Sequence, residues 1–244
     1  MKNLLTPLSI AFLLLSSCTN TVENISINLN FTQNWDTMPV TNQDFNEFKF
    51  STANGEKISI ERLRYVISNI SLVGDKNYTL IDVGENSGSL LNINNLTPGS
   101  YKITFVFGFQ DEDNTDGIYQ DLNTASFNVP GMLGGGYHYM QFDGKYKNEN
   151  DEDSNFNYHT IRAVDKTNPD NLIFEDTSFE VDLGTVILTN NAEIEIKMNI
   201  AEWFKNPNTW DLNQLNTVLM PNFNAQKMMS ENGKSVFSLG EVNQ

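Results

Sequence analysis

Apolar and polar residues alternate one by one along several stretches of this 244-residue chain, and this period constrains the fold more than any other feature. Ile25, Ile27, Leu29 and Phe31 alternate with polar residues, and Ala192–Ile200 repeats the pattern near the end. Successive side chains of a strand point to opposite faces of a sheet, so this period indicates strands with one buried face. The chain is therefore predicted to be mainly β.

Turn signals such as Asn54-Gly55 and Pro98-Gly99 separate further strands, and a register break of the kind that a bulge causes is predicted near Ser68-Asn69. A short helix is predicted at residues 200–204 and another at 224–231, before Asn232-Gly233. The other predicted strands cover residues 45–50, 58–72, 78–83, 89–93, 102–109, 137–142, 156–164, 174–181 and 185–188. With no internal repeat, we expect a single antiparallel β-sandwich of roughly ten short strands with a short C-terminal helix.

The only cysteine, Cys18, follows a charged start and the apolar run Leu4–Leu15. This arrangement is typical of a cleaved signal peptide. Leu15–Cys18 also resembles a bacterial lipobox, which implies cleavage before Cys18 and acylation of that residue. We expect a signal peptide at residues 1–17, a lipidated linker at 18–24 and a β domain at 25–244. The protein would then be exported and held by acyl chains in a membrane leaflet of the cell envelope, at the periplasmic face or in the outer membrane.

The charge balance restricts the partners of this chain. Thirty-one acidic residues face 15 Lys and Arg, a formal charge of −16, which disfavours binding to nucleic acid. Once Cys18 is acylated no thiol is left for a disulfide or a cysteine nucleophile, and no nucleophile elbow, phosphate-binding loop or zinc-protease motif is present. We therefore do not expect an enzyme.

The two histidines, His138 and His159, lie in the two predicted strands of one hairpin. Imidazoles from neighbouring strands are suited to copper or zinc, provided that both face the same side of the sheet. Met140, or else Met132 or a tyrosine, could add a further ligand. The alternative is that each histidine is an ordinary hydrogen-bonded strand residue.

Two acidic loops, Asp111–Gly117 and Asn148–Asp153, suggest calcium, which prefers hard oxygen ligands. The first loop fails the EF-hand pattern, since its sixth position is Asp116 and its twelfth is Leu122. A calcium loop of another kind and a merely solvated loop both stay open.

Several segments resemble the MbnP-like proteins in the same order along the chain, and Leu63–Ile70 is the most specific of them. The segments are Gly55-Glu56 with Ile58–Ile60, Leu63–Ile70 with Leu72, Pro98–Tyr101 with Phe105 and Gly108, Gly136-Tyr137 with Phe142–Gly144, Phe156 with His159, and Met228–Gly233 with Phe237. The resemblance implies an exported, often lipid-anchored β protein associated with copper, with His159 at the position of a metal-ligating histidine. It also implies a di-haem enzyme as a partner.

One departure from the family pattern concerns tryptophan. The family's characterised copper binders have tryptophans before the Gly-Tyr segment, one of which becomes kynurenine, whereas this chain has Met132–Gly136 there. We therefore expect copper sequestration or delivery through His138 and His159, without kynurenine. The alternative is a non-catalytic envelope module that binds a glycan or protein partner and has lost the family's metal site.

Overall fold

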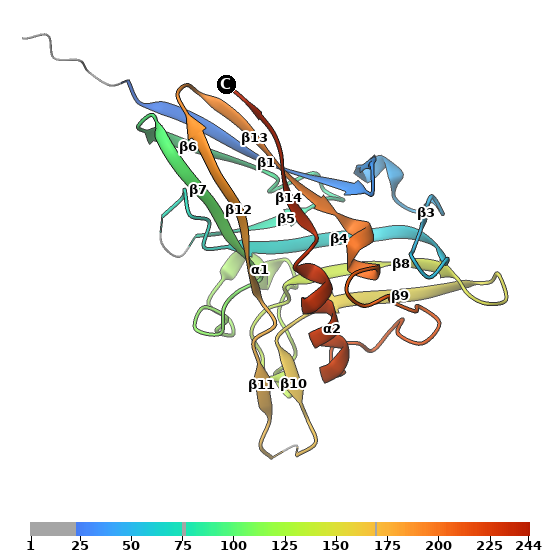
Figure 1. The fold of residues 1–244 in the computed structure, drawn as a ribbon. Coiled ribbons are helices and arrows are strands. Elements are labelled where there is room, and N and C mark those ends of the chain that lie inside the picture. The colour runs from blue at the N-terminus through green and yellow to red at the C-terminus, as the bar shows by residue number, and fades with distance from the viewer. Residues whose placement is uncertain (1–22, 75–76, 169) are drawn as a thin grey trace, which may run out of the picture.

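The chain folds into two β-sheets that pack against each other around one main core (Figure 1). The computed structural model describes residues 23–74, 77–168 and 170–244. The prediction of a mainly β sandwich is confirmed. Cys18 and the predicted signal peptide lie outside the described residues.

The smaller sheet has five strands, and β1 is at its centre. Strand β1 pairs with β13, β2 and β6, and β13 also pairs with β14. The β1–β13 pair is parallel, with Ile27 opposite Ala192, whereas its other pairs are antiparallel. Its strands are β1 (Ile25–Trp35), β2 (Met38–Val40), β6 (Leu90–Leu96), β13 (Ala192–Asn199) and β14 (Phe237–Asn243).

The larger sheet has seven strands in the order β12-β7-β4-β8-β9, with β3 and β5 also paired to β4. Its strands are β3 (Phe50–Ser51), β4 (Lys57–Ser68), β5 (Tyr78–Asp82), β7 (Gly99–Phe107), β8 (Met140–Lys147), β9 (Asp153–Thr160) and β12 (Phe179–Leu188). A separate hairpin of β10 (Ala163–Asp165) and β11 (Ile173–Glu175) projects below the sheets in Figure 1, next to α2.

Helical segments are short. They are η1 (Asn42–Asp44), α1 (Gln120–Thr124), η2 (Gly131–Leu133), η3 (Ile200–Phe204) and α2 (Phe223–Gly233). Helix α2 contains the predicted helix at 224–231, and the side chain of Asn222 caps it by accepting the backbone N–H of Ala225. Helix α1 lies in a segment that sequence reasoning treated as a polar loop.

Several predicted strands have different boundaries in the structure. Strand β4 ends at Ser68 because Asn69 adopts φ 50°, and its register shift lies earlier, between Ile60 and Arg62. The predicted strand at 137–142 begins only at Met140. The two strands predicted at 174–181 and 185–188 become β11 and one continuous β12, which has an irregularity around Gly184 at φ 82°.

The inner faces of both sheets form the main core, in which aromatic rings are prominent. Phe107 packs against Phe179 and Trp203, with ring centroids 5.0 and 5.1 Å apart. A second, small core contains Val129, Leu133, Ile161 and Val164. Within the described ranges, none of the helices is long and apolar enough to cross a bilayer.

Gly108, at the end of β7, offers a test of this packing. Its φ is 83°, and a Cβ there would lie 2.3 Å from Cγ of the buried Tyr139. We expect Gly108→Ala to lower the free energy of unfolding by about 2–5 kcal/mol, from left-handed strain together with overpacking. Gly117→Ala is the matched control, because Gly117 has φ 77° but open space at its Cβ. Denaturant unfolding of both variants measures the difference, and equal losses would contradict the packing argument.

Candidate metal centre

Polar side chains cover the outer face of the larger sheet where β4, β8 and β9 lie side by side. Gln141 of β8 is paired with Arg64 of β4 and with His159 of β9. In the next row Asp143 is paired with Asn157. Paired residues of neighbouring strands share a face, so His159 and Asp143 both lie on the outer side.

His159 is oriented by Asp143. Its Nε2 is 2.7 Å from Asp143 Oδ1, and the same carboxylate also accepts from Asn157 and pairs with Arg62. Burial raises the pKa of Asp143, but its bonds with His159 and Asn157 and the Arg62 charge together bring it below the ordinary value. The carboxylate is therefore ionised and accepts the Nε2–H. In the neutral, metal-binding form of His159 the free lone pair is on Nδ1.

His138 lies just before β8, not within a strand as predicted. Its backbone N–H donates to the carbonyl of Phe127, and the next residue, Tyr139, donates to Thr160. Gly136 allows this path because a Cβ there would lie 2.6 Å from the side-chain oxygen of Asn114. In a continued strand, His138 would point into the core as Met140 does, because residues two apart lie on the same face. The bend before β8 instead places it against His159.

The tautomer of His138 follows from one hydrogen bond. Its Nδ1 lies 2.9 Å from the carbonyl oxygen of Phe127, which can only accept, so the ring proton is on Nδ1. Burial lowers the pKa of His138 to about 4, although this hydrogen bond opposes the shift. At neutral pH the imidazole is uncharged, and its Nε2 has a free lone pair.

The free nitrogen of His138 faces a methionine sulfur. Nε2 lies 3.2 Å from Sδ of Met220, and the rings of His138 and His159 have centroids 5.3 Å apart at 83°. Neither Nε2 in this tautomer nor the thioether has a proton to share. Two lone-pair donors thus face each other, together with a second imidazole.

Met220 and the residue that holds it were missed by sequence reasoning. Met220 lies in the irregular segment between η3 and α2, where no period marks a facing residue. Gln226 of α2 is 1% exposed, and its Nε2 donates to the carbonyls of both His159 and Leu219. Its Oε1 accepts from Ile161. One glutamine therefore fixes the backbone of His159 relative to the segment that carries Met220.

The other sequence candidates lie elsewhere. Met140 is fully buried in the main core, in register with Tyr65 and Thr160, and Met132 is 72% exposed. All three tryptophans are buried in the main core, at most 3% exposed. Met220, rather than Met140, is the methionine whose sulfur contacts an imidazole.

The acidic loop at 111–117 has a structural role. Asn114 accepts the backbone N–H of Tyr137, and Asp113 accepts from Asn69. In the part of the chain that the structure describes, no three side chains of His, Cys, Asp or Glu come together as a metal-binding group. The two imidazoles with Met220 are a different set, because their third member is a thioether.

His159 can be reached from solvent. A surface depression of about 510 Å³ is lined by Arg62, Asp143, Asn157 and His159, among others, but not by His138 or Met220. His159 has 15% of its side chain exposed, whereas His138 is 4% exposed overall. His159 is therefore the more accessible of the two histidines.

Comparison with known proteins shows the family of this chain. The MbnP family profile matches residues 24–222, which is most of the chain. The chain belongs to the MbnP family. Among solved structures it is similar to MbnP from Methylosinus trichosporium, with a TM-score of 0.54 and 12% identity over 90% of this chain and 99% of that one. At this identity the likeness concerns the fold alone. No curated protein matches the chain.

The family match ends at residue 222, so it includes His138, His159 and Met220 but not α2. The family resemblance implies copper. The donor atoms of this MbnP-family chain suit that ion both in their separation and in their type. Metal–nitrogen and metal–sulfur bonds are about 2.0–2.3 Å long, so a single ion can contact both His138 Nε2 and Met220 Sδ at their present separation. Neutral imidazole and thioether are donors that copper accepts well. The residues present therefore fit the ion.

Proposed function

We propose that this protein binds copper in the bacterial cell envelope, through His138, His159 and Met220, and sequesters or delivers the ion without catalytic turnover. The observation that carries the proposal is the contact between His138 Nε2 and Met220 Sδ, beside the second imidazole. Each histidine uses one ring nitrogen to donate to a fixed acceptor. Such outer partners orient metal-binding histidines and set their tautomers.

The donor set favours copper over harder ions. Calcium and magnesium prefer oxygen ligands, whereas a thioether and two imidazoles are soft or intermediate donors. In the form that binds a metal, imidazole and thioether are neutral ligands, which suits a monovalent ion better than a divalent one. The carboxylate of Asp143 is engaged by His159, Asn157 and Arg62, so its assigned role is to orient His159.

Copper analysis of the purified protein tests the site as a whole. We expect wild-type protein from copper-supplemented medium to hold about one copper per chain, and the double variant His138→Ala, His159→Ala to hold almost none, because both imidazole donors are lost. Circular dichroism and thermal unfolding establish that the double variant is folded. Equal and negligible copper in both proteins would sink the proposal.

The two candidate methionines can be separated by one pair of variants. Met220→Leu removes the thioether that faces His138, whereas Met140→Leu makes the same change in the main core. We expect Met220→Leu to weaken Cu(I) binding by about 10-fold or more, from loss of a soft ligand, and Met140→Leu to leave it unchanged. Competition with a Cu(I) chelator measures both affinities. If only Met140→Leu weakened Cu(I) binding, Met140 and not Met220 would be the methionine ligand.

Anchoring through Cys18 is part of the same proposal, and it depends on the lipobox-like sequence Leu15–Cys18. We expect wild-type protein to be recovered in the membrane fraction with acyl chains on residue 18, and Cys18→Ser to be unacylated, since the thioether-linked lipid needs the thiol. Metabolic labelling with a fatty acid and mass spectrometry of the N-terminal peptide measure this. An unmodified cysteine in the mature wild-type protein would contradict the anchor.

A further inference from the structure

A second cavity lies between the two sheets and shares no lining residue with the histidine pair. It is a cleft of about 620 Å³, bounded by β1, β2, the end of β5 and part of β13. The pairing of β1 explains it. Strand β6 pairs with β1 as far as Asn30, and β2 pairs from Gln33 onward, so the edge of β1 is open around Thr32. The gap in the sheet edge gives access to the space between the sheets.

A buried amide lies in this cleft. Gln33 is only 9% exposed, and its Nε2 donates to the carbonyl of Phe31 at 3.3 Å and to the hydroxyl of Tyr65 at 3.0 Å. The Phe31 carbonyl can only accept, so it fixes the amide with Nε2 on that side. Among the described residues, no donor reaches Oε1 of Gln33. This oxygen is not among the unpaired side-chain atoms that are sealed from solvent, so it is open to accept a hydrogen bond from a hydroxyl or N–H in the cleft.

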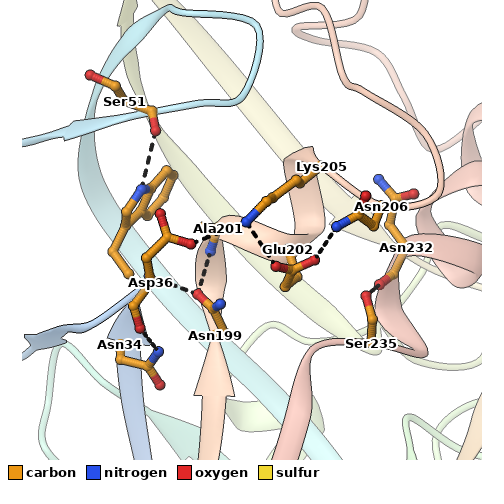
Figure 2. Close-up of polar contacts among 11 residues, drawn as sticks. Asn34, Asp36, Ser51, Asn199, Ala201, Glu202, Lys205, Asn206, Asn232 and Ser235 are labelled. Atoms are coloured by element: carbon orange, nitrogen blue, oxygen red, sulfur yellow. Dashed lines mark hydrogen bonds and ion pairs between the residues drawn. The ribbon is translucent and has the colours of Figure 1, made fainter.

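The next residue, Asn34, points to the opposite face of β1. Asn34 also lines the cleft, and within the described part of the chain its buried Oδ1 has no hydrogen-bond partner. Its Nδ2 donates to the carbonyl of Asp36, as Figure 2 shows. Gln33, which bonds the core hydroxyl of Tyr65, is therefore the amide that faces the space between the sheets.

The turn after β1 holds the rim of the cleft in place. The backbone N–H of Asp36 donates to Oδ1 of Asn199 at 2.9 Å, and the ammonium of Lys205 lies between Asp36 and Glu202 (Figure 2). Because this turn is already fixed, a ligand would not have to order it, which lowers the entropic cost of binding.

The lining indicates the class of ligand. Apolar walls alternate with amide and hydroxyl groups, a mixture that suits a sugar ring with its apolar faces and hydroxyl edges. Three acids, Asp36, Asp82 and Glu195, outnumber the one base, Lys197, which already pairs with Glu195 at 3.2 Å. This charge disfavours phosphate and carboxylate ligands. The volume lies within the range of about 300–1,000 Å³ that is usual for small-molecule sites. The apolar walls are formed by Phe31, Val40, Ile81 and Val83, and the hydroxyl and amide groups include Thr41, Asn42, Asn86 and Ser89.

We propose that the cleft between β1, β2 and β5 binds a neutral saccharide of one or two rings, with Gln33 as its buried hydrogen-bond acceptor. This site acts independently of the histidine pair. The saccharide would be a second ligand of the protein, bound by hydrogen bonds and apolar contacts instead of metal–ligand bonds.

The test measures binding of two neutral disaccharides, N,N'-diacetylchitobiose and cellobiose, to the metal-free full-length protein by isothermal titration calorimetry and ligand-observed NMR. We expect saturable binding of at least one of them, with a Kd of about 1 mM or tighter. We expect digalacturonate to bind at least about tenfold more weakly because of the acidic lining. The His138→Ala, His159→Ala variant should bind the disaccharide as the wild type does.

Two variants locate the binding. Gln33→Met removes the buried acceptor, and Thr37→Trp fills the mouth of the cleft from an exposed position, so it tests the site even if Gln33→Met does not fold. Each is expected to weaken binding at least about tenfold, whereas Thr97→Trp, on an exposed turn that does not line the cleft, is expected to have no effect. Failure of both disaccharides to bind folded wild-type protein would overturn the proposal. Binding that survives Thr37→Trp would overturn it as well.

Discussion

His138 makes two hydrogen bonds to one acceptor, the carbonyl oxygen of Phe127. The backbone N–H fixes where the residue lies, and the ring Nδ1–H fixes which nitrogen is free. The arrangement of the candidate centre depends on this acceptor, because a tautomer with the proton on Nε2 would present a donor to Met220 instead of a lone pair. Phe127 is fully buried, so water does not compete with His138 for hydrogen bonds to this carbonyl.

The remaining parts of the centre are held from other directions. Asp143 orients His159 from the neighbouring strand, and Gln226 of α2 joins the backbone of His159 to the segment before Met220. The β8–β9 hairpin and the segment that ends in α2, far apart in the sequence, thus meet at this centre. The chain gathers these donors without a disulfide bond, by hydrogen bonds between side chains and backbone.

Much of the fold could be predicted from the alternation of apolar residues, because burial of one strand face is a local signal. The closeness of His138 and His159 followed from their place in one hairpin. The strand assigned to His138 was wrong, since three glycines with positive φ and the contact with Asn114 end regular pairing before Met140. Met220 could not be predicted, because its contact with His138 spans 82 residues and comes from a segment without regular structure.

The cleft at β1 could not be predicted from the sequence either. Gln33 occupies a core-facing position in an otherwise apolar row, and only the gap between β6 and β2 explains why an amide is there. In both places a polar group at an unexpected position marks the site, and long-range pairing decides what it faces.

X-ray absorption at the copper K edge of the copper-loaded protein tests whether His138, His159 and Met220 bind one copper ion together. We expect imidazole nitrogen scatterers together with one sulfur scatterer that is absent from Met220→Leu. A spectrum with no sulfur scatterer, identical in wild type and variant, would contradict it.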